Sequence, residues 1–349
     1  MKRFYTQGAR RLSPVVSPAW TRVFDRRGFL GLCALAALGS AGCTPDAEGS
    51  GSGGEGSTVV FADEVEDEPL TQAQIDAAAA EAFEPSPLSL DEVPADFSAF
   101  SLSGASEPTI DETLLDAVQS AVDDIEERSE VGFVFYDLYT GRGLAYGADT
   151  AIYGASSFKA LYSLFICECV AEEQGYELSS TTKSRIEAAV VYSDNDSYRA
   201  LRSTFDGYGF DEWLAERNVA DVSSSDSSSF PTYCARTSAR LWTEMYLYLQ
   251  TGSELAGWLE GLVGSTTTSF LREALEETGA EVLNKAGWIA GSQEKYNSTT
   301  DAGIITLDGD SYILSIMTSA AYTDSALERY EQLAQAVFAV REALGVEEG

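Results

Sequence analysis

The amino-acid sequence predicts an α/β (α+β) fold in which an antiparallel sheet is flanked by helices. Two observations predict this class: strand-like segments lie near both ends of the globular part, and helical segments lie between them and at each end. We therefore expect the first and last segments to share one antiparallel sheet. The chain has 349 residues, 44% of them apolar, which is enough for one large domain or two once non-globular ends are removed.

The individual elements follow from hydrophobic spacing. ETLLDAVQSAVDDIEE, from residue 112, has apolar residues three and four apart and predicts an amphipathic helix. VGFVFYDLYTG and RGLAYG predict two strands joined by a turn at Thr140-Gly141. An apolar helix is expected from Ser156, then a mostly helical stretch over about 184–250 that a Ser-rich loop, DVSSSDSSSFP, interrupts. AEVLNKAGWI, TDAGIITL and SYILSIMTS alternate like strands, and ALERYEQLAQAVFAVREAL predicts a closing helix.

Charge and composition exclude several classes of function. A protein with a formal net charge of -34 would be repelled by DNA or RNA phosphates, so nucleic-acid binding is not expected. The sequence contains no histidine, which removes Ser-His-Asp and Cys-His nucleophile systems and any His-ligated metal site. No metal or cofactor is predicted. Proton transfer must rest on Lys, Asp, Glu, Tyr or Ser.

The first 43 residues predict an export signal. Seven of the first 27 residues are Lys or Arg, and the apolar run GFLGLCALAALGSAG follows. Arg26-Arg27 and the residues after them resemble a twin-arginine signature, and Ser40-Ala41-Gly42-Cys43 resembles a lipobox that would leave Cys43 lipidated. Lipoboxes usually carry Leu where this chain has Ser40. The alternative is a plain amino-terminal membrane anchor.

Residues 44–107 predict an acidic, disordered linker, and residues 108–349 a globular domain. Between Thr44 and Glu127 there are 22 acidic residues and no Lys or Arg, and the linker begins with EGSGSGGEGS. The domain contains three cysteines: Cys167, Cys169 and Cys234. One of the first two could pair with Cys234 in an oxidising compartment, but separately buried thiols are equally compatible, and we assume no disulfide.

A serine three residues before a lysine is the first candidate for chemistry. Of the five lysines, three have this neighbour: Ser156/Lys159, Ser180/Lys183 and Ser292/Lys295. The motif alone therefore does not discriminate, but its surroundings do. Only Lys159 lies on an apolar helix, where burial favours the neutral amine and thus lowers the pKa of the lysine. A neutral amine one helical turn from Ser156 can accept its proton, and the amino end of the helix offers N–H donors to a developing oxyanion.

Two further motifs follow in order along the chain. Ser193-Asp194-Asn195 comes after an apolar segment, and Lys285-Ala286-Gly287 lies inside a predicted strand. Together with Ser156-Ser-Phe-Lys159 they resemble the S-x-x-K, S-D-N and K-T-G signature of class A β-lactamases and penicillin-binding proteins, over roughly residues 110–345. The resemblance implies a β-lactamase/transpeptidase-like fold, with an acyl-transfer site between a helical lobe and an α/β lobe.

The resemblance also implies a role for each matching residue. Ser156 would be the nucleophile and Lys159 its base, while Ser193 would relay a proton to the leaving amine. Asn195 would bind a substrate amide, and Lys285 would bind a substrate carboxylate and lower the pKa of Lys159. The remaining assignments complete the substrate-binding set: Gly287, which lets substrate approach the strand, and the N–H groups of Ser156 and Trp288, which form the oxyanion hole. The alternatives are a helix cap for Ser193-Asp194-Asn195 and a surface strand lysine for Lys285.

The chain departs from the family pattern at two places. Ala286 stands where the family offers a hydroxyl to a substrate carboxylate, and no Glu-x-x-Leu-Asn follows the second motif. Asp226 matches that glutamate poorly and is better interpreted as a solvated loop residue. We therefore expect an exported serine hydrolase that acylates on β-lactams, cell-wall peptides or related amides and esters, and deacylates slowly. The alternatives are a non-catalytic lipoprotein whose cleft binds peptidoglycan or a protein partner, and a small-molecule binder of unrelated fold.

Overall fold

A seven-stranded antiparallel sheet organises residues 70–225 and 230–345, the part of the chain that the computed structural model describes. The strand order is β1-β3-β2-β9-β8-β6, and β7 pairs with β8 as well. The strands are β1 (Ser98–Ser101), β2 (Val131–Asp137), β3 (Arg142–Tyr146), β6 (Glu281–Asn284), β7 (Gly287–Ile289), β8 (Ser298–Leu307) and β9 (Asp310–Thr318). A separate two-stranded pair joins β4 (Ile152–Tyr153) to β5 (Thr232–Tyr233).

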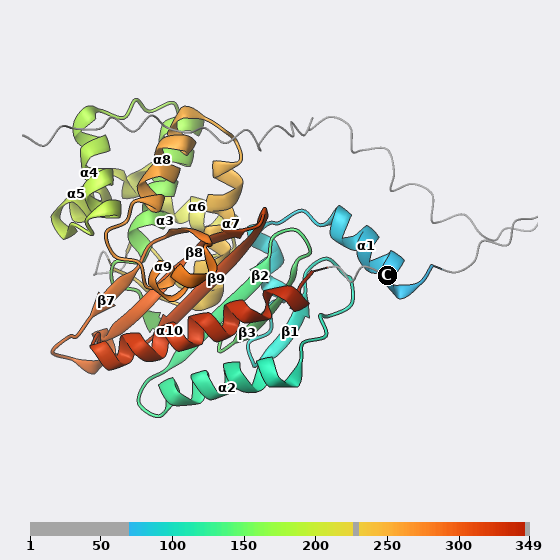
Figure 1. The fold of residues 1–349 in the computed structure, drawn as a ribbon. Coiled ribbons are helices and arrows are strands. Elements are labelled where there is room, and N and C mark those ends of the chain that lie inside the picture. Colours follow the sequence, from blue (N-terminus) through green and yellow to red (C-terminus); the bar gives the residue numbers. More distant parts are fainter. Residues whose placement is uncertain (1–69, 226–229, 346–349) are drawn as a thin grey trace, which may run out of the picture. The chain divides into compact units, whose positions relative to one another are not determined.

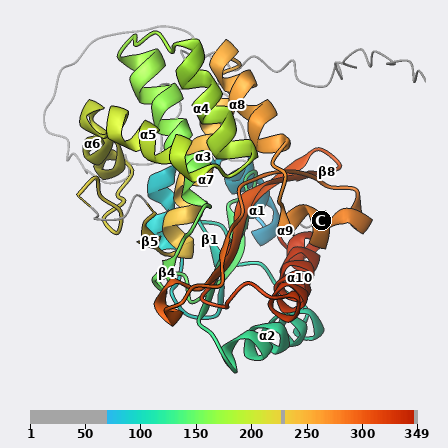
Figure 2. The same cartoon turned by 90° about the vertical axis from the view of Figure 1, so that its left-hand side faces the viewer.

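Helices cover both faces of the sheet. α2 (Glu112–Glu126) and α10 (Asp324–Ala339) lie side by side on one face, and a helical lobe lies on the other (Figures 1 and 2). The lobe consists of α3 (Phe158–Phe165), a π-helix η2 (Ile166–Glu173), α4 (Ser180–Val191), α5 (Asn195–Phe205), α6 (Phe210–Glu216), α7 (Ala235–Leu249) and α8 (Glu254–Gly264). Four short 3-10 segments and one short helix complete these two layers: η3 (Asp206–Tyr208), α9 (Phe270–Ala274), η4 (Glu276–Thr278), η5 (Glu294–Tyr296) and η6 (Val340–Ala343).

The alternation of side chains along β2 creates two separate cores. Phe133 and Phe135 point to the layer of α2 and α10, whereas Val134 and Tyr136 point to the helical lobe. All four side chains are fully buried, as expected for a central strand that is covered on both faces. The prediction that the first and last segments share one antiparallel sheet is confirmed, because β2 pairs with β9 over its whole length.

The predicted linker was too long. Within residues 70–107 the structure contains α1 (Gln72–Ala82), a 3-10 segment η1 (Pro87–Glu92) and β1, which forms an edge strand on β3. Asp76 of α1 forms a 2.7 Å ion pair with the buried Arg142, which also donates to the main-chain oxygens of Ser106 and Gly345. The folded region therefore begins before Pro108, and tertiary hydrogen bonds hold this acidic segment.

Several predictions concern residues outside the ranges that the structure describes. The export signal at 1–43, Cys43, the linker over 44–69 and Asp226 lie outside the described residues. Within the described ranges, none of the helices combines the length and apolar composition that crossing a bilayer requires.

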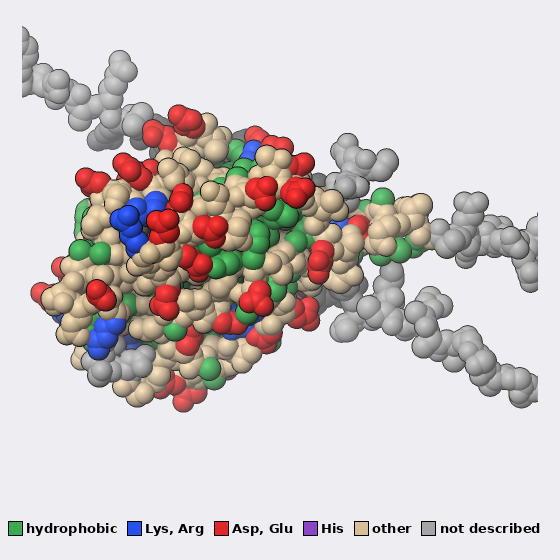
Figure 3. Space-filling model, turned by 90° about the horizontal axis from the view of Figure 1, so that it is seen from below, with side chains coloured by type: hydrophobic (Ala, Val, Ile, Leu, Met, Phe, Trp, Pro, Cys, Tyr) green, Lys and Arg blue, Asp and Glu red, His purple; other side chains and the backbone are tan. Residues whose placement is uncertain are grey.

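Cys167, Cys169 and Cys234 are buried free thiols. Figure 3 shows acidic side chains spread over the face of α2 and α10, with few basic ones among them.

A hydroxyl pair fixes the helical lobe to the sheet and allows a stability test. The Tyr136 hydroxyl lies 2.6 Å from Thr243 Oγ1, which in turn donates to the main-chain oxygen of Ala239, so Tyr136 acts as the donor. We expect Tyr136→Phe to lower the free energy of unfolding by about 1 kcal/mol, the net contribution of one such bond. Urea unfolding measures this, with Tyr139→Phe as the control, because Tyr139 is 54% exposed. An equal effect of both substitutions would contradict the assignment.

Candidate active site

Ser156 lies in a tight turn between β4 and α3. The Ser157 N–H donates to the Gly154 carbonyl at 3.0 Å, and the Lys159 N–H donates to the Ser156 carbonyl at 3.2 Å. The apolar helix predicted from Ser156 therefore begins two residues later, at Phe158. Ser156 is partly exposed between buried neighbours, and Ala155 before it has a φ of +47°. This strained turn presents the Ser156 side chain next to the amino end of a buried helix.

Lys159 is fully buried on the first turn of α3. Its Nζ donates to the main-chain oxygen of Ser193, and to Asn195 Oδ1 at 2.7 Å. Both acceptors belong to the second predicted motif, between α4 and α5. The structure therefore brings the first two motifs into direct contact, as the resemblance implied.

Lys285, from the segment between β6 and β7, also contacts Ser193. Its Nζ donates to Ser193 Oγ at 2.5 Å and to the Ala286 carbonyl at 2.8 Å. Lys285 is 1% exposed, so its interpretation as a surface lysine is wrong. Ser193 thus stands between two lysines, with its carbonyl on Lys159 and its hydroxyl on Lys285. Lys285 and Ala286 lie between β6 and β7 and not inside one continuous strand.

The helix-cap interpretation of the second motif holds for its middle residue alone. Asp194 is the N-cap of α5 and accepts from the Ser197 N–H at 2.7 Å. Ser193 has a φ of +56°, a conformation that is uncommon for residues other than glycine, and this lets its carbonyl and hydroxyl face different lysines. Capping and the lysine contacts therefore coexist, because they use different residues.

The electrostatics of the site keep one amine close to neutrality. Burial, then the charge of Lys285, lowers the pKa of Lys159 to about 7. Burial also lowers the pKa of Lys285, to about 8, against the opposing effect of the Asp301 carboxylate. Asp301 is itself buried, which raises its pKa to about 6, and Asn284 donates to both of its oxygens. The two amines thus share a site with limited compensation by negative charge.

The contacts of Lys159 leave one position on its nitrogen available. A neutral amine has two N–H groups and one lone pair, and the two N–H groups are used by Ser193 and Asn195. The lone pair is then directed away from both acceptors. Ser156 lies three residues before Lys159, in the turn that leads into α3, so a lone pair on Lys159 Nζ that reaches its hydroxyl could accept the Ser156 proton.

Gly287 lets strand β7 pack directly against the turn of Ser156. A Cβ atom at this position would lie 2.2 Å from the Gly154 oxygen, 2.6 Å from the Ser157 nitrogen and 3.0 Å from the Ser156 nitrogen. Any side chain here would push the strand and the turn apart. Trp288 follows on the same strand, and its ring packs against Phe270, with centroids 6.1 Å apart, and over the Lys285 amine at 5.5 Å. The main chain of Trp288 is therefore held beside the turn that contains Ser156.

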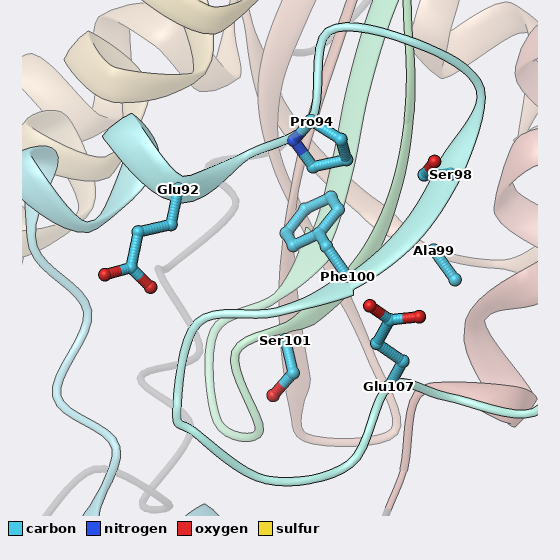
Figure 4. Close-up of a pocket in the computed structure, with 7 residues that line it drawn as sticks. All are labelled: Glu92, Pro94, Ser98, Ala99, Phe100, Ser101 and Glu107. Atoms are coloured by element: carbon cyan, nitrogen blue, oxygen red, sulfur yellow. The ribbon is translucent and has the colours of Figure 1, made fainter.

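Two other features add no polar side chain to this site. Ala286 is fully buried in the core between the sheet and α10, so it offers no polar group to a ligand. A pocket beside β1 is lined by residues that include Glu92, Phe100 and Glu107 (Figure 4). Because β1 and β6 are at opposite ends of the strand order, this pocket is not part of the lysine site.

Sequence reasoning missed three contributors to the site. Tyr198 lies on α5 three residues after Asn195, a spacing that could have placed it near Lys159. Its ring centroid is 5.9 Å from Lys159 Nζ, and that of Phe230 is 5.4 Å away. Phe230 comes from the Ser-rich loop, and nothing in its sequence neighbourhood indicated this contact. Asp301 lies on β8, within a run whose alternation predicted only a strand.

Comparisons with known proteins agree with this geometry. The model of the "Beta-lactamase enzyme family" matches residues 175–340. A PBP-A variant solved as an acyl-enzyme complex with penicillin G is 18% identical, with a TM-score of 0.52, over 65% of this chain and 96% of that one. A β-lactamase from Chitinophaga pinensis is 17% identical, with a TM-score of 0.53, over 66% and 100% of the two chains. The TLA-1 extended-spectrum β-lactamase is 15% identical, with a TM-score of 0.54, over 67% and 98%.

The chain has the fold of class A β-lactamases and penicillin-binding proteins, and the matched family model covers its carboxy-terminal part. The β-lactamase/transpeptidase-like fold predicted from the three motifs is confirmed. A search of curated proteins found no match. At identities of 15–18% the likeness concerns the fold, and the chemistry of this chain has to be argued from its own site.

The pH dependence of acylation tests the pairing of the two lysines. We expect the rate at which a fluorescent penicillin labels the protein to rise through about pH 7, as Lys159 loses its proton. Lys285→Gln removes a neighbouring positive charge, so the pKa of Lys159 rises and the midpoint moves to higher pH. Lys183→Gln is the control, because Lys183 lies on α4 and its amine lies over the Trp258 ring of α8. An unchanged midpoint in Lys285→Gln would contradict the proposed coupling.

Proposed function

We propose that this protein is an exported serine hydrolase that forms an acyl-enzyme on Ser156. The observation that carries the proposal is the buried Lys159, whose pKa is lowered to about 7 and whose two N–H groups have acceptors in the second motif. Burial of Lys159, with a second lysine bound to the same serine, disfavours the charged form of its amine. Such an arrangement is typical of a general base.

The acylation step can be written from these residues. Lys159 Nζ takes the proton of Ser156 Oγ, and Oγ attacks the carbonyl carbon of an amide, ester or β-lactam. The resulting oxyanion is stabilised by the N–H groups of Ser156 and Trp288, which the close packing at Gly287 holds together. The carbon–nitrogen bond, or the carbon–oxygen bond of an ester, then breaks and leaves an ester on Ser156.

The leaving group needs a proton, and Ser193 is placed to deliver it. Its hydroxyl oxygen accepts from Lys285, so its own hydrogen can pass to the departing nitrogen. Ser193 Oγ then receives the proton that Lys159 took from Ser156, which restores the Ser193 hydroxyl and the neutral Lys159 amine. Asn195 uses its oxygen on Lys159, which leaves its NH₂ group to bind a substrate carbonyl. Lys285 supplies positive charge for a substrate carboxylate.

The substrate class proposed is β-lactams, cell-wall peptides or related amides and esters. A PBP-A variant of the same fold forms an acyl-enzyme with penicillin G, which supports a β-lactam as the probe. This chain has no Glu-x-x-Leu-Asn after its second motif, and its Ala286 is buried without a hydroxyl. These differences favour fast acylation with slow hydrolysis.

We also propose that the protein acts outside the cell membrane as a lipoprotein. The support is confined to the sequence: Arg26-Arg27, the apolar run after them, and Cys43 at the end of a lipobox-like segment. The acidic segment that follows would act as a spacer between the anchor and the folded domain. A palmitate label that is incorporated by the wild type and lost in Cys43→Ala is the expected result.

Covalent labelling tests the nucleophile. We expect intact-protein mass to increase by one penicillin after incubation, with the adduct mapped to Ser156 and absent from Ser156→Ala. Ser180→Ala is the matched control, because Ser180 and Lys183 repeat the motif at the start of α4. Reversible binding of peptidoglycan fragments without any adduct would instead support the non-catalytic alternative.

A further inference from the structure

The Phe230 ring covers Lys159 on the side of the Ser-rich loop. Its centroid lies 5.4 Å from Lys159 Nζ and 5.3 Å from the centroid of Tyr198, whose own centroid is 5.9 Å from the same nitrogen. Tyr198 is fully buried, and Phe230 packs on the core of the helical lobe. Two aromatic rings therefore lie within 6 Å of the amine, in addition to the acceptors from Ser193 and Asn195.

Phe230 also contacts a second cation, Arg199, whose guanidinium carbon lies 5.4 Å from the ring centroid. Arg199 pairs with Asp196 at 3.2 Å, and its side chain is 55% exposed. Lys159, in contrast, is fully buried. The half-buried Phe230 ring therefore contacts both a buried amine and a more exposed guanidinium.

The position of Phe230 bears on the second half of the reaction, the hydrolysis of the acyl-enzyme. To hydrolyse the acyl-enzyme, a water oxygen must attack the ester carbon on Ser156 while a base takes the water proton. The bond between that carbon and Ser156 Oγ then breaks, Oγ regains a proton and the acid product leaves. The water must lie within hydrogen-bond reach of the base. An aromatic ring over the amine occupies that space and offers the water no strong hydrogen-bond partner.

We propose that Phe230 is a positioning residue that excludes hydrolytic water from Lys159 and thereby sets the lifetime of the acyl-enzyme. The inference rests on the proposed function, and it adds a cause to the slow hydrolysis expected there. The missing glutamate removes a base for water, whereas Phe230 removes access to the base that remains. In the described chain the two hydrogen-bond acceptors of Lys159 are the Ser193 main-chain oxygen and Asn195 Oδ1, and neither is a carboxylate. The amine therefore binds no acidic side chain that could act as the base in place of the missing glutamate.

The test compares Phe230→Ala with Phe230→Leu. Each protein is labelled with penicillin, excess reagent is removed, and intact mass follows the loss of the adduct. We expect Phe230→Ala to shorten the adduct lifetime by about tenfold or more, because a smaller side chain admits water, and Phe230→Leu to stay close to the wild type. In Phe230→Ala the acylation midpoint should also move to higher pH, since water around Lys159 favours its charged form. A lifetime unchanged by Phe230→Ala would overturn the proposal.

A second measurement keeps this test separate from the proposed function. Reductive methylation with formaldehyde, mapped by peptide mass, reports access to each lysine without any acyl-enzyme. We expect Lys159 to react slowly in the wild type and in Phe230→Leu, and faster in Phe230→Ala, with Lys183 and Lys295 as internal references. If no penicillin adduct forms, the proposed function fails. Equal methylation of Lys159 in all three proteins would then overturn the role of Phe230 as well.

Discussion

The contact of two buried lysines with one serine is the interaction on which the site depends. The Ser193 carbonyl accepts from Lys159 on α3, and its hydroxyl accepts from Lys285 beside β7, so one residue joins the helical lobe to the sheet. The same site determines the electrostatics, since burial and then the charge of Lys285 lower the pKa of Lys159. Structure and reactivity therefore have a common origin, and the motif residues cannot be exchanged independently of one another.

The surrounding fold supports this arrangement at several points. Ala155 and Ser193 adopt positive φ angles on either side of the site, and Gly287 admits the close approach of β7 to the Ser156 turn. Asp301 is held by Asn284 and by the amino end of α9, and it supplies partial compensation for Lys285. Local strain and buried charge are concentrated here, as is common where function and stability compete.

Sequence reasoning found most of the sheet and the lysine site because both leave local signals. Period-2 alternation identified β2, β8 and β9, and three ordered motifs located Ser156, Ser193 and both lysines. It missed β1 and the attachment of residues 70–107 to the domain, because acidic, proline-interrupted composition carries no apolar face and Asp76 is held by a distant Arg142. It missed Phe230 because a loop residue reaches Lys159 only through the tertiary fold.

The protonation state of Lys159 is the measurement that tests this account most directly. The sequence contains only five lysines, so a lysine-selective ¹⁵N NMR titration of the full chain can resolve each amine. The account predicts one amine titrating near pH 7, absent from Lys159→Arg, and a second near pH 8 that belongs to Lys285. Titration of Lys159 near its ordinary pKa of about 10.4 would contradict the central claim, because a charged amine could not accept the proton of Ser156.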